Sequence, residues 1–83
     1  MRRILKQPIA HPGAFELRGR PVTIALDGNA NPCVYFEDDG GLSGLYAVAV
    51  LFTGDTIPDG MTVVSTTRDP GGIVWHLATE VSS

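Results

Sequence analysis

The stretch Leu45-Tyr46-Ala47-Val48-Ala49-Val50-Leu51-Phe52 decides the fold, because it is the longest uninterrupted apolar run in the chain. Eight residues are too few for a membrane-spanning helix, which needs about 20. The run contains β-branched and aromatic residues, and glycine-rich turn sequences lie before and after it. These features predict a central strand that is covered on both faces. A closed barrel, a second sheet or another subunit would each provide that cover.

The rest of the chain contains six more short runs with strand character, separated by turn sequences. They span residues 1–10, 14–18, 22–27, 33–37, 61–67 and 73–79. No segment repeats its apolar residues at helical spacing, and most glycines and prolines lie between the runs. Short strands about ten residues apart are typical of a small antiparallel barrel or sandwich. We therefore predict a single all-β domain over residues 1–83 with about seven short strands.

Individual residues sharpen this prediction. Pro8 cannot donate a hydrogen bond to a strand ladder, so it belongs near a strand end or on a sheet edge. Alternation in 22–27 predicts that Val22, Ile24 and Leu26 share the buried face of their strand. Trp75 is the expected anchor of the core, because one buried indole removes about 150–250 Å² from water.

Composition restricts the classes of partner and the compartment. The 83 residues carry nine acidic and six basic side chains, a net charge of -3, without the basic excess of a nucleic-acid-binding protein. Cys33 is the only cysteine, which excludes an internal disulfide and fits a reducing compartment. Prolines and a glycine interrupt the basic N-terminal stretch before a signal-peptide core can form. We predict a cytoplasmic protein that does not enter a membrane.

Several chemical motifs are present only in part. Asp27-x-Asn29-x-Asn31 followed by Asp38 resembles a calcium loop, but Pro32 replaces its glycine and strands flank it, so a hairpin turn is the better interpretation. His11, Cys33 and His76 lack zinc-site spacing, and Cys33 with His76 as a base is equally unsupported. The glycine-rich stretch 40–44 lacks the lysine of a phosphate loop and is interpreted as a linker. We predict no enzymatic activity, no metal and no cofactor.

Four sequence motifs occur in an order that resembles a family of small, uncharacterised proteins of bacteriophages and prophages. They are Met1-Arg2-Arg3-Ile4-Leu5-Lys6, Asn31-Pro32-Cys33-Val34-Tyr35, Phe52-Thr53-Gly54 with Ile57-Pro58-Asp59, and Gly71-Gly72-Ile73-Val74-Trp75-His76. The resemblance spans nearly the whole chain, and the Val-Trp-His ending is its most specific motif. The relatives tend to carry His-Pro after Thr-Gly, where this chain has Asp55-Thr56. The resemblance implies a phage gene product that acts in the bacterial cytoplasm.

We expect a non-enzymatic host-takeover or counter-defence protein that blocks a bacterial immune protein or complex, as anti-CRISPR inhibitors do. Acidic residues would then face a basic groove of the partner: Glu37, Asp38, Asp39, Asp55 and Asp59. The loop 53–60 is the strongest functional candidate among the loops, since binding residues often lie on loops of rigid scaffolds.

Two other functions remain open. An oligomeric protein that sequesters a cyclic nucleotide would need phosphate-binding and base-stacking groups, for which the candidates are Arg2, Arg3, Arg18, Arg20, Tyr35, Tyr46, Thr53 and Gly54. A structural or assembly accessory of the virion is the other alternative. We also expect a homo-oligomer, at least a dimer, because so short a chain has little material to cover both faces of 45–52.

Overall fold

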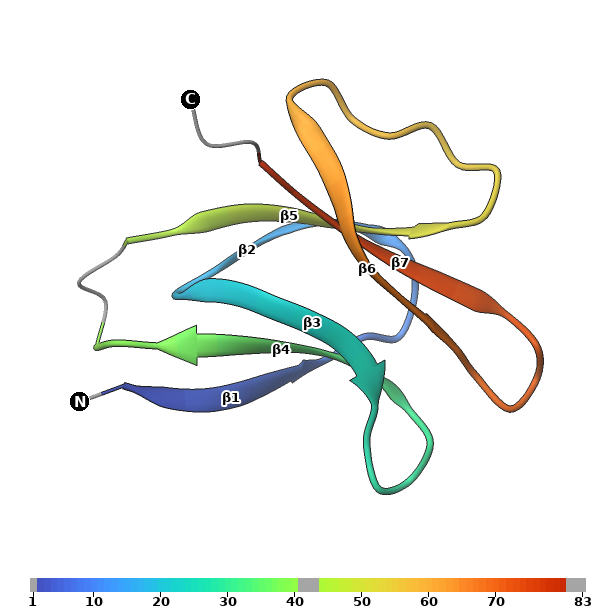
Figure 1. Cartoon of the computed structure of the whole chain (residues 1–83), viewed down its shortest axis with the longest axis horizontal. Coiled ribbons are helices and arrows are strands. Elements are labelled where there is room, and N and C mark those ends of the chain that lie inside the picture. Colours follow the sequence, from blue (N-terminus) through green and yellow to red (C-terminus); the bar gives the residue numbers. More distant parts are fainter. Residues whose placement is uncertain (1, 41–43, 81–83) are drawn as a thin grey trace.

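The computed structural model describes residues 2–40 and 44–80, and every regular element within them is a strand (Figure 1). The seven strands are β1 (Arg3–Pro8), β2 (Gly13–Leu17), β3 (Arg20–Leu26), β4 (Pro32–Asp38), β5 (Tyr46–Phe52), β6 (Met61–Arg68) and β7 (Val74–Glu80). Their ends lie within two residues of the predicted runs. The prediction of an all-β fold with about seven strands is confirmed. Residues 41–43 of the predicted linker lie outside the described residues.

Two antiparallel sheets pack against each other as a sandwich. One sheet has three strands in the order β1-β4-β3, and the other has four in the order β2-β5-β7-β6. Figure 1 shows the first sheet in the lower half and β2 beside β5 above it, with the β6–β7 hairpin crossing on the right. β5 lies inside its sheet, as predicted, and Pro8 ends the edge strand β1.

The core lies between the two sheets. It is built from the inward residues of five strands, β2, β3, β4, β5 and β7, and includes Trp75 and Leu77 of β7. The Trp75 and Phe52 rings meet edge to face, with centroids 4.8 Å apart. This geometry suits the quadrupoles of the two rings. Trp75 is therefore part of the core, as its size predicted.

β5 is buried on its inner face and covered in part on its outer face by its own chain. Val48 and Val50 point into the core and are fully buried. On the outer face Ala49 is only 1% exposed, and it pairs with Ala14 of β2 and Ala78 of β7. Ala47 and Leu51 on the same face are only partly buried, so the chain covers this face in part, and self-association stays a prediction.

The two sheets are fastened together where β3 and β6 meet. Each strand has an irregularity there: the register shifts between Pro21 and Thr23 in β3, and between Val63 and Ser65 in β6. Ser65 Oγ lies 2.7 Å from Thr23 Oγ1 and accepts a hydrogen bond from the Ile24 amide at 3.2 Å. β-Bulges bend a strand and re-aim its side chains in this way.

The irregularity in β3 overturns one detail of the sequence interpretation. Strict alternation placed Val22 with Ile24 on the buried face, but Val22 is 46% exposed whereas Ile24 is buried. The shift beside Val22 turns its side chain outward. Throughout the described ranges there is no helix long and apolar enough to cross a bilayer.

Candidate functional site

The opposite side of the sandwich, between β1 and β2, is open. These strands follow each other in sequence but belong to different sheets. Among the described strands, β1 pairs with β4 alone and β2 with β5 alone. Each therefore presents a free edge on the same side of the molecule. A free edge carries unpaired N–H and C=O groups that can pair with another chain, so proteins usually protect such an edge or use it for binding.

A groove follows this open side. Its first part has a volume of about 370 Å³ and is lined by Leu5 and Gln7 of β1, Leu17 of β2 and Phe36 of β4, among others. Its second part, of about 460 Å³, runs along the corner from Gln7 to Glu16. Gln7 and Glu16 line both parts, so the two parts of the groove adjoin each other. Each volume falls within the range of ordinary ligand sites, about 300–1,000 Å³.

The groove combines apolar walls with charged groups at its mouth. Leu5 is 36% exposed, and Phe36 is partly buried against the core. Glu16, Arg18 and Asp38 supply the charges. Arg18 makes no ion pair with any residue that the structure describes, so its guanidinium is available to a partner. The surface fits an amphipathic ligand with both apolar and charged groups.

The predicted acidic site and the predicted basic site partly neutralise each other. Glu37 accepts hydrogen bonds from Arg2 and from Arg20, each at 3.1 Å. Asp38 lies 3.9 Å from Arg3. The strand register sets these pairs, since it places Arg3 opposite Asp38 and Arg20 opposite Glu37. Exposed ion pairs such as these stabilise a fold by about 0–1 kcal/mol.

The five acidic residues do not form one surface. Glu37 and Asp38 end β4, and Asp39 follows them, half-buried. Asp55 and Asp59 lie on the loop between β5 and β6, at the other end of the molecule from the tip of β4 (Figure 1). The Asp55 carboxylate accepts a hydrogen bond from the Phe52 amide at 2.8 Å and so shapes its own turn.

The residues proposed for a nucleotide are also dispersed. Tyr35 lies on β4 and Tyr46 on β5, in different sheets, and both are half-buried. Thr53 and Gly54 lie beyond the end of β5. The Thr53 hydroxyl lies 2.8 Å from Nε2 of His76, whose Nδ1 lies 2.9 Å from the Thr66 hydroxyl. Only Arg18 of the predicted set lines the groove.

The loop 53–60 borders a smaller hollow on the outer face of the four-stranded sheet. This hollow has a volume of about 190 Å³, and Leu51, Ile57, Val63 and His76 are among its lining residues. Hydrogen bonds close the loop at both ends, from the Asp55 amide to the Phe52 carbonyl and from the Met61 amide to the Pro58 carbonyl. It is an ordered turn with a shallow apolar surface.

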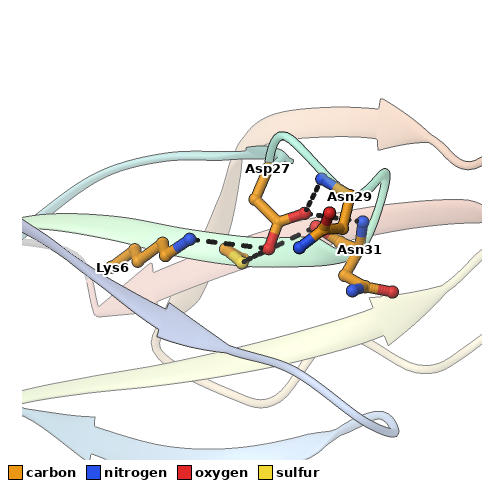
Figure 2. Close-up of polar contacts among 5 residues, drawn as sticks. Lys6, Asp27, Asn29 and Asn31 are labelled. Carbon is orange, nitrogen blue, oxygen red and sulfur yellow. Dashed lines mark hydrogen bonds and ion pairs between the residues drawn. The ribbon is translucent and has the colours of Figure 1, made fainter.

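The Asp27 hairpin is a structural cluster rather than a calcium loop (Figure 2). Asp27 Oδ1 accepts hydrogen bonds from the amides of Asn29 and Asn31, at 2.8 and 3.0 Å, and Oδ2 lies 3.5 Å from Lys6 Nζ. The hydrogen bond from the Asn31 amide makes the largest contribution to lowering the pKa of Asp27. The carboxylate is thus held ionised, and it orders the turn between β3 and β4.

Cys33 belongs to the same cluster, and its chemistry is that of a buried thiol. Its Sγ lies 3.7 Å from Asp27 Oδ2 and 3.6 Å from the Asn31 carbonyl, and the residue is fully buried. Burial first, and then the Asp27 charge, raise the pKa of the thiol. A nucleophile needs the thiolate, which this environment disfavours. The described residues contain no group of three potential metal ligands.

Sequence reasoning named Arg18 and Asp38 but missed the other residues of the groove. Leu5 lies in the first of the four motifs, but no residue pattern marked Leu5, Gln7 or Phe36 as a site, and they line the groove because no described strand lies between β1 and β2. One partial signal was present, because Pro8 indicated either a strand end or a sheet edge. The strand that lies beside the open edge of β1 is set by the order of strands in the sheets. The alternation of apolar and polar residues does not specify that order.

Comparisons with known proteins add no relative. No protein-family model matches the chain, and no curated protein or solved structure matches it either.

Proposed function

We propose that this chain is a non-enzymatic binding protein that takes up a partner protein at the open side between β1 and β2. The observation that carries the proposal is the combination of two free strand edges with a groove of apolar and charged residues between them. Backbone groups on a free edge give affinity, and pockets beside it give specificity.

The resemblance to small phage and prophage proteins supplies the biological setting. A phage protein that works by binding in the host cytoplasm would block a host immune protein or complex by covering one of its surfaces. We therefore propose a counter-defence inhibitor with a protein target. The charged groups at the mouth, Glu16, Arg18 and Asp38, would contribute mainly to the rate and selectivity of the encounter.

Sequestration of a cyclic nucleotide is the weaker proposal. Three of its four candidate arginines are already engaged by Glu37 and Asp38. The two tyrosines intended to stack a base lie in different sheets. A phosphate ligand would have to displace these ion pairs before the arginines could bind it. Titration with cyclic dinucleotides followed by calorimetry tests this alternative directly.

The protein-binding proposal is tested by one pair of leucine variants. Leu5→Glu places a charge in the groove, whereas Leu45→Glu places the same charge at an exposed position just before β5. The readout is phage plaquing on bacterial strains with defined immune systems, with circular dichroism to verify folding. We expect wild type and Leu45→Glu to restore plaquing in at least one strain, and Leu5→Glu to lose the effect. Equal activity of the two variants would contradict the proposal.

A further inference from the structure

The hydrogen-bond alternation along β1 identifies the backbone groups on its free edge. The Ile9 amide donates to the Pro32 carbonyl, and the register places Ile9 opposite Pro32 by continuing the pairs Gln7–Val34 and Leu5–Phe36. Hydrogen-bonded and non-hydrogen-bonded pairs alternate in an antiparallel ladder. Leu5 and Gln7 therefore bond to β4. Ile4 and Lys6 direct both N–H and C=O groups away from β4, and Pro8 directs only its carbonyl.

The interior beside this edge has room for one more strand. A three-stranded sheet faces a four-stranded sheet, and the two are fastened at β3 and β6. β2 at the far side consequently has no strand of the smaller sheet opposite it. The inward side chains there, Phe15 of β2 and Phe36 of β4, are only partly buried. A fourth strand beside β1 would make both sheets equal and would fill the groove.

The charged residues along β1 favour one kind of incoming strand. The residues on the outer side of β1 are Ile4 and Lys6, and Arg2 precedes them in the same alternation, whereas Arg3 has the parity of Leu5. The Arg2 and Lys6 side chains remain 76% and 50% exposed although each has an acidic neighbour. The groove on the inner side is lined by Leu5 and Phe36. An incoming strand should thus carry acidic residues outward and apolar residues inward.

A second copy of the chain fits this edge less well. Residues whose N–H and C=O groups face the free edge lie opposite each other in such a pair, so Ile4 and Lys6 must oppose Ile4 or Lys6. Ile4 opposite Ile4 sets Arg2 against Lys6, and Lys6 opposite Lys6 sets two lysines together, which leaves Ile4 opposite Lys6 as the register without opposed like charges. Like charges directly opposite each other destabilise a sheet. Lysine on an edge strand is also a common protection against self-pairing.

We propose that the groove accepts an extended segment of a partner protein, which adds to β1 as an antiparallel strand with alternating apolar and acidic residues. The segment exchanges hydrogen bonds with the backbone of Ile4 and Lys6 and places its apolar side chains against Leu5 and Phe36. This inference rests on the proposed function, because it specifies how the partner binds at the open side.

A peptide of alternating valine and glutamate, acetylated and amidated, serves as the probe, with ¹⁵N NMR titration of the full chain as the measurement. We expect shifts of the Ile4 and Lys6 amides. Ile4→Pro removes one outward N–H without touching the β1–β4 ladder, whereas Ile4→Ala retains it. Ile4→Pro should weaken binding about tenfold or more, and Ile4→Ala by less than about threefold.

Two modified peptides keep the test decisive even if Ile4→Pro fails to fold. Methylation of the glutamate amide nitrogens blocks the bonds to β1 and should abolish binding. Methylation of the valine amides, which point away from β1, should not. Equal binding of both peptides, unchanged binding by folded Ile4→Pro, or no binding of the unmodified peptide at millimolar concentration would overturn the proposal.

Three further outcomes separate the inference from the function on which it rests. A dimer in which the Ile4 and Lys6 amides are protected without peptide would make a second copy the occupant and overturn the inference. If Leu5→Glu loses activity against host defence while folded Ile4→Pro keeps it, the open side binds a partner by another mode. If neither variant loses activity, the proposed function fails as well.

Discussion

The Asp69 carboxylate fixes the position of the only tryptophan. It accepts hydrogen bonds from Trp75 Nε1 and from the Ile73 amide, each at 3.0 Å, and so closes the turn between β6 and β7. The Trp75 bond is the largest cause that lowers the pKa of Asp69. A carboxyl with a lowered folded-state pKa stabilises the fold above its unfolded pKa, about 3.9, and loses that contribution as pH falls through the folded value.

We therefore expect Asp69→Asn to lower the melting temperature at pH 7 and to converge with wild type as pH falls well below 4. Thermal unfolding followed by circular dichroism from pH 7 to pH 2 measures this. A difference that stays constant over that range would show that the charge of Asp69 does not matter.

Cys33 provides a second prediction for a single residue. Because the thiol is fully buried and its pKa is raised, we expect it to react with a thiol reagent at pH 8 far more slowly than in urea. The labelling rate should follow the opening of the native structure. A native rate equal to the unfolded rate would contradict the described burial.

The hydrogen bonds of Ser65 join β6 to β3 and thereby connect the two sheets. Ser65→Ala removes the acceptor for the Ile24 amide and the neighbour of the Thr23 hydroxyl. We expect a loss of about 1–3 kcal/mol in the free energy of unfolding, measured with urea. Thr62→Ala, at an exposed position of the same strand, is the control and should change it by less than about 0.5 kcal/mol. Equal effects would mean that Ser65 does not join the sheets.

The connection between β2 and β3 depends on Gly19. A Cβ at this position would lie 2.0 Å from the backbone oxygen of Glu37, so a side chain forces β4 to move. We expect Gly19→Ala to destabilise the fold by about 3 kcal/mol. Gly28→Ala, in the open hairpin turn, meets no atom within 4 Å and serves as the control. Similar melting temperatures for the two variants would contradict this packing.

Local patterns in the sequence predicted elements better than the relations between them. Turn residues and alternation located all seven strands, and the Asp27 turn followed from its Asp-Gly and asparagine chemistry. The outward position of Val22 could not be predicted, because a bulge depends on how β3 meets β6. The acidic and basic candidates were treated as separate sites, and only the register shows that Arg20 pairs with Glu37.

For the whole molecule, the central feature is asymmetry: the sandwich is fastened at β3 and β6 and open at β1 and β2. An open apolar side in so small a protein reduces the buried core, and stability is limited in chains of this length. A binding function is a reason for so small a protein to retain this open side. The binding proposals, the groove and the free edge all depend on this one property of the topology.

Native-state hydrogen exchange of the β1 amides tests that property most directly. In a dilute monomer, we predict slow exchange at Leu5 and Gln7, whose N–H groups bond to β4, and fast exchange at Ile4 and Lys6, whose N–H groups face the open side. NMR spectra recorded after transfer into D₂O resolve the four residues. Equal protection of all four in the monomer would show that the edge is covered and would contradict the account.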